Sequence, residues 1–183
     1  MAAPRFFLPA AFAATALIAA PASASPKGWQ TASDVGVYSL MAVSIGLPLV
    51  DGDNQGALQA AGSIGAATLV ATGLKEAFPK TRPDGSDRKS FPSGHTSNAF
   101  AAAASLANRE GLSAGIPAFV VASFVGVARV EGKKHYWSDV AVGAGIGTAA
   151  GLLITRQRPA ERQAALIPWG DAHGGGFTFA ARF

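Results

Sequence analysis

The chain has 183 residues, of which 49% are hydrophobic and only 14% are charged, against roughly 25% charged in an ordinary soluble domain. This length suits one domain with a real core and is too short for two comfortable ones. The absence of cysteine excludes disulfides and thiolate metal sites. The net charge of +4 gathers beside histidines rather than in a stripe interleaved with aromatics, which argues against nucleic-acid binding.

The N-terminus has the pattern of an export signal. Arg5 precedes an apolar run over residues 6–20, and Ala22-Ser23-Ala24 follows as a small-x-small cleavage pattern. We expect residues 1–24 to be a signal peptide, with a retained first membrane helix as the alternative. In either case the chain after Ser25 begins on the outer side of the membrane. The polar stretch Lys27–Asp34 that follows is interpreted as a linker.

The rest of the chain is dominated by apolar runs without strand-like alternation. Each run has about the 17 residues that minimally cross a bilayer. The sequence therefore predicts an all-α fold, a bundle of five main apolar helices, with Ser93 as a plausible N-cap for the third. The runs are Val35–Val50, Ala57–Phe78, Thr96–Asn108, Leu112–Val130 and Ser138–Ile154.

The helical runs favour a membrane-embedded or membrane-bound protein. Gly143, Gly147 and Gly151 fall on every fourth residue of one helix, a small-residue face that lets membrane helices approach closely. A freely soluble protein stays open as the alternative, because the acidic loop 51–56 would be cytoplasmic against the positive-inside tendency. The third run also carries polar side chains, namely Asn98, Ser105 and Asn108.

Threading the five runs through a bilayer places three connections on one side. With residue 25 outside, the loop after the second run, the start of the third run and the loop before the fifth run all fall outside. Those places hold three short segments that carry two histidines, a carboxylate and several cations. They are Lys75–Pro83, Pro92–His95 and Arg129–Asp139.

These segments suit phosphoryl transfer, which needs positive groups around the phosphoryl oxygens, an in-line nucleophile and a proton donor for the leaving oxygen. Lys75, Arg82 and Arg129 can supply the positive charge, and the planar fork of arginine can bind two oxygens at once. Ser93 and Gly94 open a helix, where free backbone N–H groups form an anion site. Gly94 removes bulk there, and the Ser93 hydroxyl adds a donor.

The histidines complete the chemistry. His135 and Asp139 are four residues apart, so Asp139 could accept a hydrogen bond from one imidazole nitrogen and leave the other free to attack. His95 is then left as the general acid, and later as the base for a water. His173, which lies beside a glycine run, is interpreted as incidental.

The segments resemble the three signature motifs of the type 2 phosphatidic acid phosphatase (PAP2) superfamily, which also contains bacterial class A acid phosphatases and vanadium haloperoxidases. The family pattern K-x6-R-P, P-S-G-H and S-R-x5-H-x3-D is kept in every spacing, with Ala128 in place of the usual Ser. The resemblance implies an all-α bundle without a metal or cofactor. It implies His135 as nucleophile, Asp139 as its orienting group, His95 as acid/base, and Lys75, Arg82, Ser93, Gly94 and Arg129 as phosphate-binding residues.

The resemblance implies a metal-independent phosphatase with a phosphohistidine intermediate, and the apolar helices favour lipid phosphates. A periplasmic acid phosphatase acting on soluble phosphomonoesters is the main alternative. A vanadium-dependent haloperoxidase is a remote one, since those enzymes are usually much larger. A non-catalytic membrane protein is a further alternative, which the intact histidines and Asp139 oppose. We expect an exported protein in the cell membrane with its site facing outward, or a periplasmic one, and the sequence leaves the oligomeric state undetermined.

We expect the phosphatase domain to span residues 25–160 and a Gly/Phe-containing tail to span 161–183. The remaining sequence signals are weak. Alternation of Phe177, Phe179 and Phe183 predicts a terminal strand or a packing tail. Residues 51–54 (Asp-Gly-Asp-Asn) hint at a calcium loop but lack its closing Glu.

Overall fold

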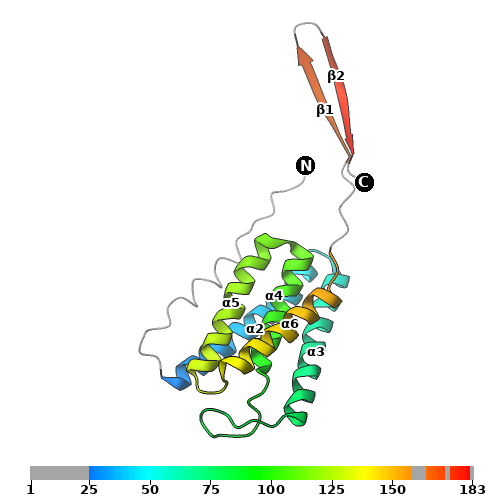
Figure 1. Ribbon diagram of the computed structural model, residues 1–183. Coiled ribbons are helices and arrows are strands. Elements are labelled where there is room, and N and C mark those ends of the chain that lie inside the picture. Colours follow the sequence, from blue (N-terminus) through cyan, green and yellow to red (C-terminus); the bar gives the residue numbers. More distant parts are fainter. Residues whose placement is uncertain (1–24, 158–163, 172–173, 182–183) are drawn as a thin grey trace.

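The computed structural model describes residues 25–157, 164–171 and 174–181. Its main body is a bundle of helices, drawn in Figure 1 from blue to orange, and this confirms the predicted all-α bundle. The expected signal segment, residues 1–24, lies outside the described residues. The helices are α2 (Pro26–Val50), α3 (Asn54–Ala77), α4 (Gly94–Glu110), α5 (Leu112–Glu131) and α6 (Trp137–Ile154).

The first helix corrects the sequence interpretation. Lys27–Asp34 is not a linker, because it forms the opening turns of α2. The Ser25 hydroxyl accepts a hydrogen bond from the Gly28 amide at 3.2 Å, and Pro26 occupies the first helical position. Both are ordinary helix-start signals. The stretch can be polar because the other helices cover only one face of it. Ser33 lies on that face and is fully buried.

Helix α4 runs through the middle of the bundle and contacts each of the other helices. Its alanines at 99 and 101–104 are fully buried. Its polar side chains bond to neighbouring helices, as when Asn98 accepts from the Thr68 hydroxyl at 2.9 Å and Ser105 bonds to Thr155 at 2.5 Å. These polar groups have hydrogen-bond partners on neighbouring parts of the bundle, so they do not oppose a membrane setting.

The glycine face of α6 packs directly on the backbone of α4. A Cβ added at Gly143 would lie 2.6 Å from the carbonyl oxygen of Ser93, and Gly147 and Gly151 are blocked by α4 backbone in the same way. The close helix approach that the glycine spacing predicted is therefore present. It also brings the start of α6 against the start of α4, which positions the site described below.

The outer helices suit a bilayer. By length and apolar composition, α2, α3, α5 and α6 could each cross a membrane. Large aliphatic side chains face outward on them, including Leu58, Leu69, Val120 and Leu153. We therefore describe the chain as a membrane protein.

An ion pair holds the end of the bundle where α2 joins α3. The Asp53 carboxylate caps α3 through the Gly56 amide at 3.0 Å and also pairs with Arg109 of α4 at 2.6 Å. The Arg109 guanidinium donates further to the carbonyl of Arg156 at 3.0 Å. The turn that hinted at a calcium loop thus uses its Asp53 carboxylate to join α3, α4 and the end of α6.

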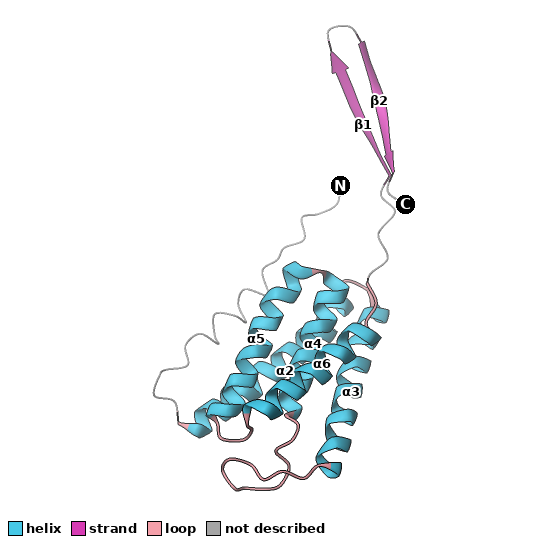
Figure 2. Cartoon of the chain, in the orientation of Figure 1, coloured by secondary structure: helices cyan, strands magenta, loops and turns pink. Residues whose placement is uncertain are grey.

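The C-terminal region contains two paired strands, whereas the sequence predicted one. Strands β1 (Ala164–Asp171) and β2 (Gly174–Ala181) pair as an antiparallel hairpin, coloured magenta in Figure 2. The sequence predicted a terminal strand only from the alternation of Phe177, Phe179 and Phe183, of which Phe183 lies outside the described residues. The first strand was missed because it contains Pro168 and does not alternate polar and apolar residues.

Candidate active site

The three motif segments meet at one end of the bundle, the lower end in Figure 2. The α3–α4 loop, the start of α4 and the turn between α5 and α6 all lie there. The loop is folded on itself, because the Lys80 amide donates to the Arg88 carbonyl at 3.0 Å and the Ser90 amide donates back to Lys80 at 2.9 Å. It is also tied to the α5–α6 turn by an ion pair between Asp84 and Lys134 at 2.6 Å. Hydrogen bonds from Lys134 and Ser86 hold the pKa of Asp84 well below its usual range.

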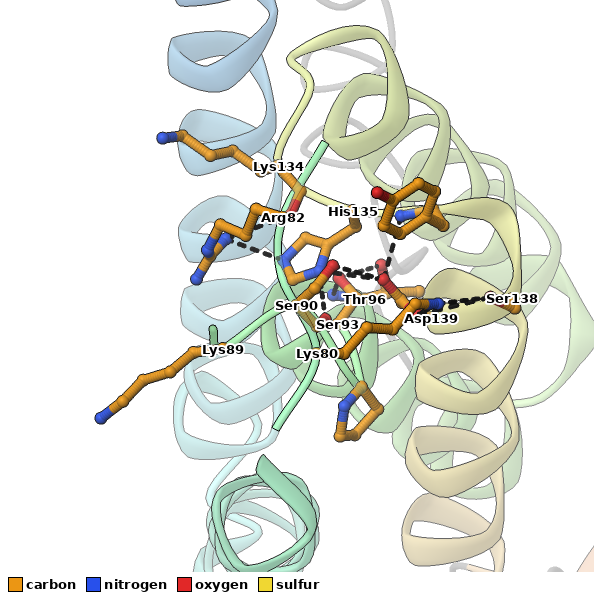
Figure 3. Close-up of polar contacts among 12 residues, drawn as sticks. Lys80, Arg82, Lys89, Ser90, Ser93, Thr96, Lys134, His135, Ser138 and Asp139 are labelled. Carbon is orange, nitrogen blue, oxygen red and sulfur yellow. Dashed lines mark hydrogen bonds and ion pairs between the residues drawn. The ribbon is translucent and has the colours of Figure 1, made fainter. Parts of the chain in front are cut away.

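His135 lies buried at the centre of this end, and Figure 3 shows its ring between Arg82 and Ser90. Its Nδ1 lies 2.6 Å from the backbone carbonyl of Ser90. Because a carbonyl only accepts, Nδ1 carries the proton and Nε2 keeps a free lone pair. Burial, followed by the positive charge of Arg129, lowers the pKa of His135 to about 3. The imidazole is therefore neutral, as a nucleophile must be.

Asp139 supports the position of the His135 ring through Ser90 and not by a direct hydrogen bond. Its Oδ2 lies 4.0 Å from His135 Nδ1, beyond hydrogen-bonding distance, so the bond expected from sequence is replaced by the one to the Ser90 carbonyl. The buried carboxylate accepts from the Ser90 hydroxyl at 2.6 Å, from Lys80 Nζ at 2.7 Å and from the Tyr136 amide at 3.0 Å. It thereby fixes Ser90, whose carbonyl orients the imidazole.

The cations converge on the same imidazole. The Nη1 of Arg82 lies 3.5 Å from Nε2 of His135, and the Nε of Arg82 donates to the Asp87 carboxylate at 2.6 Å. The charges of Arg129 and Lys75 also act on His135. Lys75 Nζ donates to the carbonyls of Lys89, at 2.9 Å, and Pro92, so it ties the loop to the start of α4.

Arg129 offers an unused donor. Its Nη1 donates to the Ser33 hydroxyl at 3.1 Å and lies 3.4 Å from Asp34 Oδ1. Its Nε is buried and has no hydrogen-bond partner among the described residues. A buried N–H without a partner is costly, and an anion oxygen would satisfy it.

The start of α4 supplies backbone donors. The Ser93 hydroxyl caps the helix through the Thr96 amide at 3.4 Å and bonds to the Thr96 hydroxyl at 2.9 Å. It is thus engaged locally here, and its contact with phosphate stays a prediction. A Cβ at Gly94 would point toward Lys75, 3.9 Å from its Cε. The Nε2 of His95, the next residue, pairs with Asp34 of α2 at 2.8 Å.

Sequence reasoning missed two residues of this network, Ser90 and Lys80. Neither belongs to the spacing pattern that carries the family resemblance. Only the folded structure reveals them. The α3–α4 loop folds back over Asp139, and the buried Asp139 carboxylate needs the polar partners that Ser90 and Lys80 supply. Ala128, the departure from the pattern, is fully buried.

Residues 56–163 match the sequence profile of the PAP2 superfamily. The chain belongs to this superfamily. Helix α2 precedes the matched residues, whereas all three motifs lie within them.

Named relatives of this PAP2 chain match its central part. A lipid A 1-phosphatase of Porphyromonas gingivalis is 39% identical over 82 residues, 43% of this chain and 18% of the relative. Lipid phosphate phosphatase 1 of Arabidopsis thaliana is 40% identical over 38% of this chain and 25% of its own length. The chain thus spans a quarter or less of these curated relatives.

Solved structures share the fold of the PAP2 chain. LpxE of Aquifex aeolicus has 26% identity and a TM-score of 0.52, covering 66% of this chain and 83% of that one. A transmembrane PAP2-type phosphatidylglycerolphosphate phosphatase of Bacillus subtilis has 22% identity and a TM-score of 0.58, covering 79% and 82%.

Proposed function

We propose that the chain is a metal-independent phosphatase that acts on lipid phosphates through a phosphohistidine intermediate. The observation that carries this is the state of His135. Its Nδ1 donates to the Ser90 carbonyl, so its Nε2 carries no proton, and a guanidinium nitrogen of Arg82 lies 3.5 Å from that Nε2. A neutral nucleophile among cations suits attack on a phosphoryl group, whose negative oxygens the cations stabilise.

The reaction proceeds in two steps. His135 Nε2 attacks phosphorus in line, the bond from phosphorus to the leaving oxygen breaks, and protonated His95 gives its proton to that oxygen. In the second step His95 takes a proton from water, the water oxygen attacks phosphorus, and inorganic phosphate leaves as the bond from phosphorus to His135 breaks. Arg82, Arg129 and Lys75 hold the phosphoryl oxygens, and the unpartnered Nε of Arg129 supports that role.

Trapping of the phosphoenzyme tests the chemistry. The full chain in detergent is incubated with substrate carrying ³²P and quenched under alkaline conditions, where phosphohistidine survives. We expect label on the wild type and none on His135→Ala, with the same result when EDTA is present. His173→Ala is the matched control and should keep its label. Labelling and turnover by His135→Ala would overturn the assignment.

The lipid character of the substrate is supported by the outward aliphatic side chains of the helices whose ends carry the site. The relatives named lipid A 1-phosphatase and lipid phosphate phosphatase point the same way. A substrate panel in mixed micelles would contain phosphatidic acid, phosphatidylglycerophosphate, a polyprenyl diphosphate and lipid A. p-Nitrophenyl phosphate and glycerol phosphate serve as soluble comparisons. Preference for the soluble esters would favour a periplasmic acid phosphatase instead.

We further propose that the site faces the outside of the cytoplasmic membrane. The export-type N-terminus and the sequence-based threading, in which the five helical runs cross in turn, support this orientation. The natural chain has no cysteine, so single cysteines can report exposure without background. Arg88→Cys at the site end should react with an impermeant maleimide on intact spheroplasts, whereas Gln55→Cys at the opposite end should react only after lysis. The reverse pattern would refute the orientation.

A further inference from the structure

Helix α2 contributes a carboxylate to the site from outside the recognised motifs. Asp34 Oδ1 lies 2.8 Å from His95 Nε2 and 3.4 Å from Arg129 Nη1. It therefore joins the acid/base histidine of the proposed mechanism to a cation of the phosphate site. The family match begins at residue 56, and Asp34 precedes it.

The opening turns of α2 are held firmly against the site. Ser33, the neighbour of Asp34, is fully buried and its hydroxyl accepts from Arg129. One turn earlier, the Gln30 side-chain amide donates to the Gly132 carbonyl at 2.8 Å. One turn later, the Tyr38 ring makes a T-shaped contact with the His95 ring, with 6.4 Å between ring centroids. The carboxylate is thus positioned by the helix on both sides.

Asp34 differs from an ordinary surface ion-pair partner. Its own side chain is 47% exposed, but the Arg129 side chain is only 8% exposed and that of His95 30%. Exposed pairs contribute little, whereas a carboxylate that reaches two partly desolvated groups acts on them through a lower effective dielectric. Its influence on the charge of His95 is therefore substantial.

Asp34 and a phosphate group can be bound at the same time. Arg129 uses only Nη1 toward Ser33 and Asp34, while its buried Nε has no partner in the part of the chain that the structure describes. A guanidinium has five N–H donors in a fixed fork, so the remaining edge can hold a phosphoryl oxygen. This argues that Asp34 is a lasting part of the site and not an anion that phosphate must displace.

We propose that Asp34 is a positioning residue of the active site, which orients the His95 imidazole and stabilises its protonated form. The proposal rests on the proposed function, in which protonated His95 gives its proton to the leaving oxygen. The bond at Nε2 leaves the second ring nitrogen for that transfer, as a carboxylate does for the histidine of a nucleophilic triad. Helix α2 is then part of the catalytic apparatus, although no motif marks it.

The other charged and titratable groups around His95 act on it in known directions. Burial and the positive charges of Arg129 and Arg82 lower the pKa of His95, and Asp34 opposes them. The Tyr38 ring is in T-shaped contact with the imidazole. Asp34 is thus the group among these that favours the protonated imidazole, and removing its charge should lower the pKa of His95 further.

The test is the titration of His95 in the full chain with Asp34→Asn. The chain has three histidines, so ¹⁵N-histidine NMR in detergent gives few signals, which His95→Gln and His173→Ala assign. We expect Asp34→Asn to lower the pKa of His95 by about one pH unit. The basic limb of kcat/KM should move to lower pH by the same amount, because less His95 is protonated there. Asp34→Glu should restore both.

Several results would overturn the proposal. An unchanged His95 titration in Asp34→Asn would do so, even if activity fell, because the effect would then be structural. Tighter binding of inorganic phosphate without a shifted pH profile would identify Asp34 as a mere counter-ion. Asp51→Asn, an exposed acid at the opposite end, controls for general charge effects. Absence of all phosphatase activity in the wild type would count against the proposed function alone, since the NMR titration still decides the pairing.

Discussion

Lys80 Nζ lies 2.7 Å from Oδ1 of Asp139, a carboxylate that has no exposed surface at all. The lysine comes from the α3–α4 loop, and its ammonium also lies over the Tyr136 ring, 4.4 Å from the centroid. The ion pair therefore fastens the loop to the start of α6. It supplies the charge that a buried carboxylate needs to remain ionised.

Lys80→Met should reduce turnover by one to two orders of magnitude. Leaving the buried Asp139 carboxylate without its cation costs about 2 kcal/mol, once the partial exposure of Lys80 is allowed for. Ser90, and with it the His135 ring, would then lose its fixed position. The measurement is single-turnover phosphorylation of His135. Lys89→Met is the matched control, since that lysine pairs with Glu76 and both side chains are more than half exposed. Equal rates for both variants would refute this role for Lys80.

The pH dependence should show an unusually low acid limb for the phosphorylation step. The pKa of His135 is about 3 in the folded protein, lowered by burial and by Arg129, against about 6.5 when unfolded. The neutral nucleophile is therefore fully populated at pH 5, and its protonation limits the rate only near pH 3. The same difference makes the unfolded chain bind more protons below pH 6.5, so stability falls as the pH drops toward 3.

Two measurements separate these effects. The His135 signal in the NMR spectrum should stay in its neutral form at pH 5, and thermal unfolding should show a lower Tm at pH 4.5 than at pH 7.5. His135→Gln should weaken that pH dependence of Tm. A His135 titration near pH 6.5 would contradict the buried, neutral nucleophile.

Gly143→Ala should damage both stability and activity. The new methyl would lie 2.6 Å from the Ser93 carbonyl oxygen, and such overpacking costs about 1–3 kcal/mol. Relief requires α4 to move away from α6, which shifts the Ser93–His95 segment. Gly145→Ala is the control, because a Cβ there meets nothing within 4 Å and alanine favours a helix by up to about 1 kcal/mol. Thermal unfolding and kcat should distinguish the pair, and equal behaviour would exclude the close contact.

Asp53→Asn should destabilise the fold while sparing the chemistry. Arg109 would become a buried cation without its partner, with its side chain only 5% exposed, at a cost of about 3 kcal/mol. Asparagine keeps the helix cap, so the loss reports the ion pair. We expect a clear fall in Tm beside an unchanged kcat per folded molecule at low temperature, with Asp51→Asn as the control. A fall in kcat with an unchanged Tm would contradict this reasoning.

The sequence predicted the helices and the meeting of the motifs well, because hydropathy and fixed spacings are local signals. It placed the starts of α4 and α6 within a few residues, and Ser93 is the N-cap it expected. It failed at Lys27–Asp34, where a polar stretch seemed to be a linker although Ser25 and Pro26 signal a helix start. The error matters because that stretch contains Asp34.

Other parts of the site are beyond sequence reasoning for a physical reason. The hydrogen bond from His135 to the Ser90 carbonyl involves a backbone atom, which no side-chain pattern records. Lys80 and Asp34 reach their partners only because separate elements pack together. The spacing of His135 and Asp139 suggested a direct bond, and the folded loop inserts Ser90 between them.

The buried alanines of α4 limit which amino-acid substitutions this protein can tolerate. Ala99 and Ala101–Ala104 of this central helix are entirely buried. A larger side chain at these positions would therefore clash with the neighbouring helices. The outward faces of α2, α3, α5 and α6 carry no such limit. In a saturation mutagenesis scan, we therefore expect substitutions to be tolerated poorly along the buried positions of α4, up to the catalytic end. The outward surfaces on either side should accept most aliphatic replacements. Divergence between relatives would be confined to the periphery, while the axis of the molecule stays nearly fixed.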